Sequence, residues 1–110
     1  MSDFALPLPV RTMIDAINSA DTEGFVSAFT STGFVNDWGT IKEGAAGVRA
    51  WAESDAIGAG AQMTVLSAVT EGETTRIHFA WSSRVFNGES DGIFVVDGDK
   101  LASFTIPPSH

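Results

Sequence analysis

The sequence predicts an α+β domain in which helices cover one face of an antiparallel sheet. In the first half of the chain, apolar residues recur every three or four positions, which is the period of a helix facing a core. In the second half, apolar and polar residues alternate one by one, as they do in strands. Because the helices precede the strands rather than interleave with them, the two kinds of element should form separate layers.

Three helices are predicted in the first half of the chain. The first begins at Pro9, whose fixed φ suits the first turn of a helix, and ends near residue 20. Asp21 caps the second, which ends between 31 and 33, and the third spans 45–56. The side chains expected to face the core are Val10, Met13, Ile14, Ile17, Phe25, Val26, Phe29, Val48, Trp51 and Ala52.

One short strand and four long strands complete the expected fold. The short strand covers 34–38 and leads into a turn or hairpin over 39–44. Asn87-Gly88 and Asp97-Gly98 are strong signals for tight hairpin turns, since both pairs tolerate positive φ. The long strands should therefore follow one another as an antiparallel meander, over 62–70, 74–86, 89–96 and 100–106.

Composition narrows the class of protein. A chain of 110 residues has room for one hydrophobic core, so we expect a single domain over 1–110. A formal net charge of −8 repels phosphate backbones and anionic membrane surfaces, which argues against nucleic-acid or membrane partners. The amino terminus lacks the basic segment of a signal peptide, and no apolar run approaches the ~20 residues of a spanning helix. We expect a soluble, cytoplasmic protein.

The residue types present exclude several kinds of chemistry. There is no cysteine, which rules out disulfides, thiolate nucleophiles and cysteine-ligated zinc. Two histidines do not form a metal-ligand cluster, and no nucleotide-binding or serine-hydrolase motif occurs. We therefore expect no metal and no cofactor.

The order of these pieces resembles the nuclear transport factor 2-like superfamily over nearly the whole chain, and most of all its SnoaL-like members, small bacterial relatives of polyketide cyclases. The pieces that carry the resemblance are "MIDAINSADTEGFVSAF", "VNDWGTIKEGAAGVRAW" and "FVVDGDKLASFTI". The resemblance implies a cone-shaped, curved antiparallel sheet wrapped around three N-terminal helices, the cystatin-like roll. It also implies a deep, mostly apolar pocket for a small molecule and a homodimer formed through the outer sheet face.

The strand at 74–86 carries sizeable side chains on both faces. Ile77, Phe79, Trp81 and Val85 fall on one side, and His78 and Phe86 fall on the other. A strand buried on one side only would alternate more cleanly with polar residues. Helices and pocket covering one face, and a partner subunit covering the other, would explain the pattern. The sequence leaves open which face lines the pocket.

Asp37 is the leading candidate for chemistry. It ends the short strand between Asn36 and Trp38, beside apolar residues that would desolvate a carboxylate. Ketosteroid isomerase belongs to the superfamily that this chain resembles, and its general-base aspartate lies at a similar position in a short Asp-x-Gly segment. The segment Asp37-Trp38-Gly39 matches that pattern. The alternative is a strand-end carboxylate that accepts hydrogen bonds from the backbone of the next turn.

The chain departs from that isomerase at the groups that stabilise the enolate. The isomerase uses a tyrosine and a protonated aspartic acid, whereas this chain contains no tyrosine. The resemblance places the tyrosine near Met13 and the acid near Asp91. Steroid isomerisation by the same mechanism therefore does not fit this sequence.

Two further ionisable residues are candidates to assist Asp37. Asp55 lies four residues after Trp51 on one helix face, where both side chains could meet Asp37 at the pocket mouth. Alternatively, Trp51 anchors the helix to the core, and Asp55 is exposed or caps the turn that leads to Gly58. His78 could act as a partner acid or base, or be satisfied by a neighbouring strand or a dimer interface. The aromatic residues expected to line the pocket, with core burial as the alternative, are Phe34, Trp38, Trp51, Trp81 and Phe104.

Two functions follow from these candidates. The first is acid–base chemistry, such as isomerisation or cyclisation, on a small apolar ligand, with Asp37 as the proton-transfer group. The second is a non-catalytic, homodimeric module that binds a ligand or has a structural role. A protein–protein adaptor is a third and weaker alternative for so short a chain.

Overall fold

Helices occupy the first half of the chain and long strands the second, as the sequence predicts. The computed structural model describes residues 6–108, so 1–5 and 109–110 of the predicted domain lie outside the described residues. This order confirms the α+β class. The elements are α1 (Leu8–Asn18), α2 (Thr22–Ser27), β1 (Phe29–Asp37), β2 (Thr40–Glu43), α3 (Gly44–Asp55), the short 3-10 helix η1 (Ile57–Ala59), β3 (Gln62–Glu71), β4 (Thr74–Ser82), β5 (Asn87–Asp97) and β6 (Lys100–Ile106).

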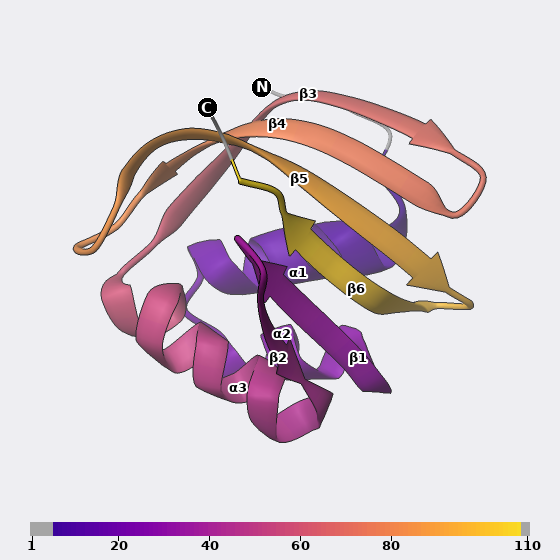
Figure 1. The fold of residues 1–110 in the computed structure, drawn as a ribbon, viewed down its shortest axis with the longest axis horizontal. Helices are drawn as coiled ribbons and strands as arrows, with labels where there is room; N and C mark the ends of the chain where they lie inside the picture. Colours follow the sequence, from indigo (N-terminus) through magenta and orange to yellow (C-terminus); the bar gives the residue numbers. More distant parts are fainter. Residues whose placement is uncertain (1–5, 109–110) are drawn as a thin grey trace.

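The six strands form one sheet in the order β2-β1-β6-β5-β4-β3. Strands β3 to β6 pair antiparallel in sequence order, which confirms the predicted meander. Strand β1 runs parallel to β6 and antiparallel to β2, so the sheet is mixed rather than wholly antiparallel. The sheet arches over the helices, which lie on its concave side (Figure 1). The parallel pairing places Asp37, the last residue of β1, opposite Ile106 at the end of β6.

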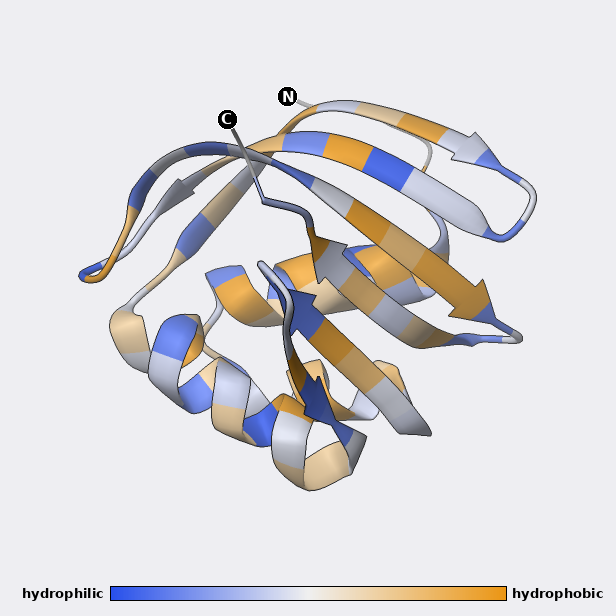
Figure 2. Cartoon of the chain, in the orientation of Figure 1, coloured by the Kyte–Doolittle hydropathy of each residue, from blue (hydrophilic) through white to orange (hydrophobic). Residues whose placement is uncertain are grey.

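The core lies between the concave sheet face and the helices. Buried and more exposed residues alternate along β4, so the large apolar side chains of Ile77, Phe79 and Trp81 all enter this core (Figure 2). Trp51 of α3 links the two layers, because its ring centroid lies 5.8 Å from that of Phe25 in α2 and 6.1 Å from that of Phe104 in β6. Trp51 is only 2% exposed. Burial of its indole against both layers holds α3 to the sheet.

The second helix is shorter than predicted, and β1 is longer. Asp21 caps the helix as expected, since its Oδ1 accepts from the Gly24 amide at 3.0 Å. The helix ends at Ser27, however, and β1 begins at Phe29 rather than at 34. Leu101 of β6 donates its amide to the Ala28 carbonyl at 2.8 Å, which starts the sheet pairing there. Tertiary pairing has overridden the helical period that includes Phe29.

One predicted hairpin turn is misplaced. Asn87 and Gly88 belong to β5, where they pair with Ser82 and Trp81, so the predicted turn at these two residues is wrong. The chain reverses over 83–86 instead. There the Ser83 hydroxyl accepts from the amides of Val85 and Phe86 at 3.2 and 3.1 Å, which stabilises a turn before the asparagine is reached.

The helices are short. The longest, α3, has 12 residues, whereas crossing a bilayer takes about 20. Within residues 6–108, no helix combines the length and the apolarity that a membrane span requires.

Gly92 on the inner face of β5 allows two aromatic rings to approach the strand closely. A Cβ at this position would lie 2.9 Å from Cε1 of Phe104 and 3.1 Å from Cε1 of Phe79. We expect Gly92→Ala to lower the free energy of unfolding by about 1–3 kcal/mol, because both rings would have to shift. Urea unfolding monitored by circular dichroism measures the change.

The control is Ser67→Ala on the outer face of β3, which should alter the free energy of unfolding by less than about 0.5 kcal/mol. A Gly92→Ala protein as stable as the wild type would contradict this account of the packing.

Candidate functional site

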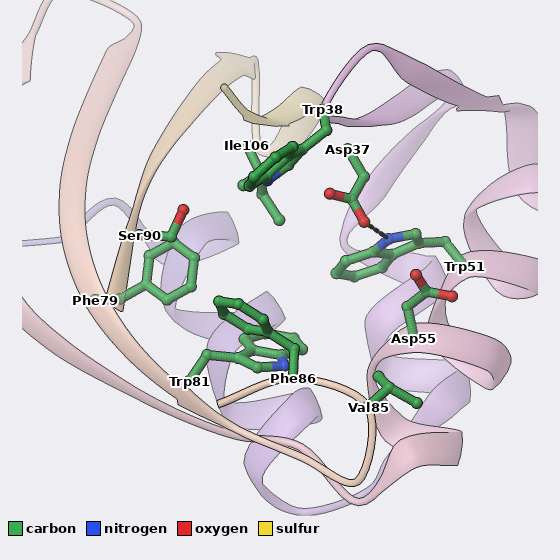
Figure 3. A pocket seen from close by; sticks show the side chains of 10 residues that line it. All are labelled: Asp37, Trp38, Trp51, Asp55, Phe79, Trp81, Val85, Phe86, Ser90 and Ile106. Atoms are coloured by element: carbon green, nitrogen blue, oxygen red, sulfur yellow. Dashed lines mark hydrogen bonds between the residues drawn. The ribbon is translucent and has the colours of Figure 1, made fainter. Parts of the chain in front are cut away.

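A cavity of about 310 Å³ opens between α3, the β1–β2 hairpin and the inner face of β4 and β5. Its volume falls at the lower end of the range for small-molecule sites. Its lining is mostly aromatic and aliphatic, with two carboxylates and one hydroxyl (Figure 3). The lining residues are Asp37, Trp38, Trp51, Asp55, Phe79, Trp81, Val85, Phe86, Ser90 and Ile106.

The β1–β2 hairpin presents Trp38 at the rim of the cavity. The two loop residues, Trp38 and Gly39, have φ of 56° and 96°, as the hairpin turn with two left-handed residues requires. The Asn36 side chain accepts from the Gly39 amide at 2.9 Å, and the Trp38 amide donates to the Ile106 carbonyl at 2.9 Å. The turn is therefore held firmly, although a left-handed backbone costs a non-glycine residue about 1 kcal/mol or more.

Asp37 is held by the core tryptophan. Trp51 Nε1 donates to Asp37 Oδ2 at 3.1 Å, and Oδ1 accepts no hydrogen bond from the described residues. In the structural alternative, Asp37 would accept a hydrogen bond from a backbone amide of the next turn. The Asn36 side chain accepts that hydrogen bond instead, from the Gly39 amide. Asp37 is thus a half-buried carboxylate with one oxygen fixed and the other free at an apolar cavity.

Helix α3 contributes Trp51 and Asp55 one turn apart, as their spacing predicts. The carboxylates of Asp37 and Asp55 lie on either side of the Trp51 indole (Figure 3). Trp51 is a core anchor and a cavity wall at once, so the two alternatives for it are both true. No lysine or arginine is found among the lining residues that the structure describes.

The opposite wall comes from the sheet and from the β4–β5 loop. Phe79 and Trp81 are alternate residues of β4 and therefore share its inner face, with ring centroids 6.0 Å apart. Val85 and Phe86 come from the loop and are 66% and 47% exposed. The Arg84 amide donates to the carbonyl of Ala59 at 2.9 Å, which ties the loop to η1 just after α3.

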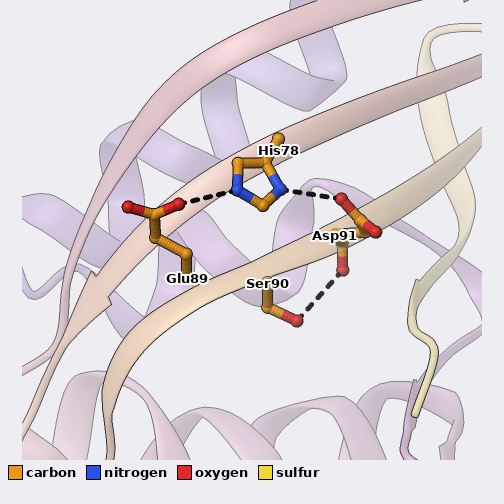
Figure 4. Close-up of polar contacts among 4 residues, drawn as sticks. All are labelled: His78, Glu89, Ser90 and Asp91. Atoms are coloured by element: carbon orange, nitrogen blue, oxygen red, sulfur yellow. Dashed lines mark hydrogen bonds and ion pairs between the residues drawn. The ribbon is translucent and has the colours of Figure 1, made fainter. Parts of the chain in front are cut away.

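His78 does not face the cavity. It lies on the outer sheet face, where Nδ1 is 2.8 Å from Asp91 Oδ1 and Nε2 is 2.8 Å from Glu89 Oε1 (Figure 4). The proposed partnership with Asp37 is therefore wrong, and the alternative of a histidine satisfied by a neighbouring strand is what the structure has. Hydrogen bonds to the carboxylates of Asp91 and then Glu89 raise the pKa of His78.

Two predicted pocket aromatics lie elsewhere. Phe104 is fully buried behind the cavity, with its ring stacked on Phe94 at 4.6 Å between centroids. Phe34 is on the outer side of β1, because its neighbour Val35 takes the buried inner position. For Phe104 the alternative of core burial is what the structure has. The prediction for Phe34 fails because strand alternation fixes a side chain's face only after the register is known.

Five lining residues were missed by sequence reasoning: Phe79, Val85, Phe86, Ser90 and Ile106. Phe79 carried a usable signal, since it lies two residues from Trp81 and must share its strand face. The loop residues had none, because the position of the turn was itself wrong. Within residues 6–108, no group of three His, Asp or Glu side chains is arranged to hold a metal ion.

Comparisons with known proteins identify the fold. The chain is similar to a nuclear transport factor 2-like protein of unknown function from Cytophaga hutchinsonii, at 13% identity and TM-score 0.78 over 89% of this chain and 84% of that one. The chain is also similar to a candidate polyketide cyclase from Sinorhizobium meliloti, at 21% identity and TM-score 0.81 over 92% of this chain and 94% of that one. A third similar structure is a protein with a ketosteroid isomerase-like fold from Catenulispora acidiphila, solved in complex with trimethylamine. Its identity is 16% and its TM-score 0.80, over 96% of this chain and 88% of that one.

These similarities confirm the predicted nuclear transport factor 2-like fold. Identities of 13–21% establish the fold and not the activity. The sequence itself matches no protein-family model and no curated protein.

The His78 cluster should make stability depend on pH. Hydrogen bonds to Asp91 and Glu89 raise the pKa of His78 in the folded state. The imidazolium therefore makes its full contribution to stability at pH values below the pKa of a histidine in the unfolded chain, about 6.5. This contribution is lost as the pH rises through the raised folded-state pKa. We expect His78→Gln to be less stable than the wild type at about pH 5.5, and we expect this difference in stability to be smaller at about pH 8.5.

Urea unfolding at both pH values measures this difference. The matched control is Glu23→Gln, which breaks an exposed ion pair with Arg49 that contains no histidine. Its effect on stability should stay constant over that pH range. A His78→Gln deficit that is constant, or that grows with pH, would show that the imidazolium is not stabilising.

Proposed function

We propose that this protein binds a small, largely apolar molecule in the cavity and that Asp37 exchanges a proton with it, as in isomerisation or cyclisation. The observation that carries the proposal is the position of Asp37, with one carboxylate oxygen fixed by Trp51 and the other free in an apolar cavity. The fold neighbours are consistent with it, because one is a candidate polyketide cyclase and another holds a small molecule.

A carboxylate held in this way has the requirements of a general base. The Trp51 hydrogen bond fixes the orientation of Asp37 without neutralising it, since an indole N–H donates and carries no charge. A substrate C–H or O–H against the free oxygen would lie within proton-transfer distance, about 3 Å. Asp55 offers a second carboxylate on the same wall to receive or return a proton.

Binding without catalysis is the second candidate, and one observation favours it. An enolate intermediate needs hydrogen-bond donors directed at its oxygen. Of the described lining residues, Ser90 supplies the only hydroxyl, and the Trp51 indole N–H is already used by Asp37. The cavity therefore offers an oxyanion fewer hydrogen-bond donors than ketosteroid isomerase does.

We also propose that two copies of the chain associate through the outer sheet face. Val69 of β3 and Leu66 at its bulge are 59% and 44% exposed, which suits burial against a second copy. Sedimentation at micromolar concentration should then give twice the 11.6 kDa chain mass. A single 11.6 kDa species would contradict the dimer. The cytoplasmic location expected from the sequence stays a prediction.

Exchange of the α-protons of 2-tetralone, an apolar ketone, tests the role of Asp37. We expect the protein in D₂O to accelerate this exchange, and Asp37→Asn to lower the acceleration about 100-fold or more, because an amide cannot accept the proton. Nuclear magnetic resonance measures the exchange, and fluorescence of the three cavity tryptophans measures binding.

Glu53→Gln is the matched control, since it removes one carboxylate from the exposed side of α3 outside the cavity. It should leave exchange and melting temperature nearly unchanged. If 2-tetralone binds but exchanges no faster than in buffer, the non-catalytic function is favoured. If Asp37→Asn retains full acceleration, another group is the base.

A further inference from the structure

We infer that the ligand of this cavity is an organic cation, an apolar molecule that carries a protonated or quaternary amine. The inference rests on the proposed function, because it concerns the same cavity and names the chemical class that the cavity recognises. Two features of the lining point to a cation, the number of aromatic rings and the sign of every charge, and a strained tryptophan at the rim points to ligand contact there.

Half of the ten lining residues are aromatic, and they come from every wall. Trp38 lies on the hairpin, Trp51 on α3, Phe79 and Trp81 on β4, and Phe86 on the β4–β5 loop (Figure 3). The negative faces of aromatic rings attract ammonium groups within about 6 Å, and tryptophan does so most strongly. A cavity of about 310 Å³ is small enough that a bound ammonium group would lie near several rings.

The charges in the lining are all negative. Asp37 and Asp55 are its only ionisable residues within the described part of the chain. An anionic ligand would lie beside two carboxylates, and a neutral one would leave both without a counter-charge next to apolar surface. Arg84, the cation on the β4–β5 loop, directs its guanidinium to the carbonyl of Gly58 instead. The net charge of −8 also attracts cations to the protein from solution.

The rim contains aromatic surface that the fold itself does not require. Trp38 is 54% exposed and Phe86 is 47% exposed, so neither gains the stabilisation of full burial. Trp38 also occupies a left-handed conformation that is rare for a bulky side chain. The hairpin turn requires this backbone, yet a bulky tryptophan occupies it, and such strained residues cluster at ligand-binding and active sites. Both rings are therefore assigned to contact with a ligand.

Three probes of nearly the same shape and different charge test the inference. They are choline, its neutral carbon isostere 3,3-dimethylbutan-1-ol, and the anion 3,3-dimethylbutanoate. We expect choline to bind roughly tenfold more tightly than the alcohol, because aromatic faces and carboxylates both favour the ammonium. The anion should bind more weakly than either. Tryptophan fluorescence and calorimetry measure the dissociation constants.

Variants separate the two sources of this preference. Trp38→Leu keeps an apolar side chain at the rim. It should therefore weaken the binding of choline several-fold and leave the affinity for the alcohol nearly unchanged. The double variant Asp37→Asn, Asp55→Asn should remove most of the remaining preference for charge. Glu53→Gln, with one negative charge lost outside the cavity, should retain the full preference.

Equal affinity for choline and the alcohol, tighter binding of the anion, or no binding of any probe would overturn the inference. The outcome is distinct from that of the 2-tetralone experiment, whose probe is neutral. Asp37-dependent exchange without a preference for choline would support the proton-transfer function and contradict the inference of a cationic ligand. A choline preference without exchange would retain the cation and remove the catalysis.

Discussion

Trp51 is the residue on which both the core and the cavity depend. Its ring contacts Phe25 in α2 and Phe104 in β6, which joins the helical layer to the sheet. Its ring also lies 6.1 Å from that of Trp81, and its indole N–H holds Asp37. Because one buried side chain has these contacts, a displacement of α3 would disturb the hydrogen bond that orients the carboxylate. The orientation of Asp37 is therefore fixed by the same packing that stabilises the fold.

Sheet topology decides where the cavity opens. Parallel pairing with β6 carries β1 along the sheet until Asp37 is level with Ile106. The hairpin turn then directs Trp38 over the space between the sheet and the end of α3. On the other side, Arg84 ties the β4–β5 loop to η1 and so places Phe86 at the same opening. Elements far apart in the chain thus close one small space whose walls are aromatic and whose charges are negative.

The two sheet faces have different chemistry. The inner face is a continuous set of rings, with Phe79, Phe94 and Phe104 in contact. The outer face carries His78 between Asp91 and Glu89, charged groups that remain in water. Exposed ion pairs contribute little to stability and respond to pH and salt. A histidine that looked like a candidate catalytic residue therefore belongs to the surface, while the ionisable groups in the described lining of the cavity are both carboxylates.

The sequence by itself determined the class of fold, the limits of most elements, and five of the cavity's lining residues, because helix and strand periods are local properties. Those five are Asp37, Trp38, Trp51, Asp55 and Trp81. Asp37, Trp51 and Asp55 were found from strand-end position and i, i+4 spacing. Only the tertiary structure decided that His78 and Phe34 point outward, and that the turn at 83–86 brings Phe86 to the cavity. A one-residue change of register turns every side chain over, and register is set by pairing between distant strands.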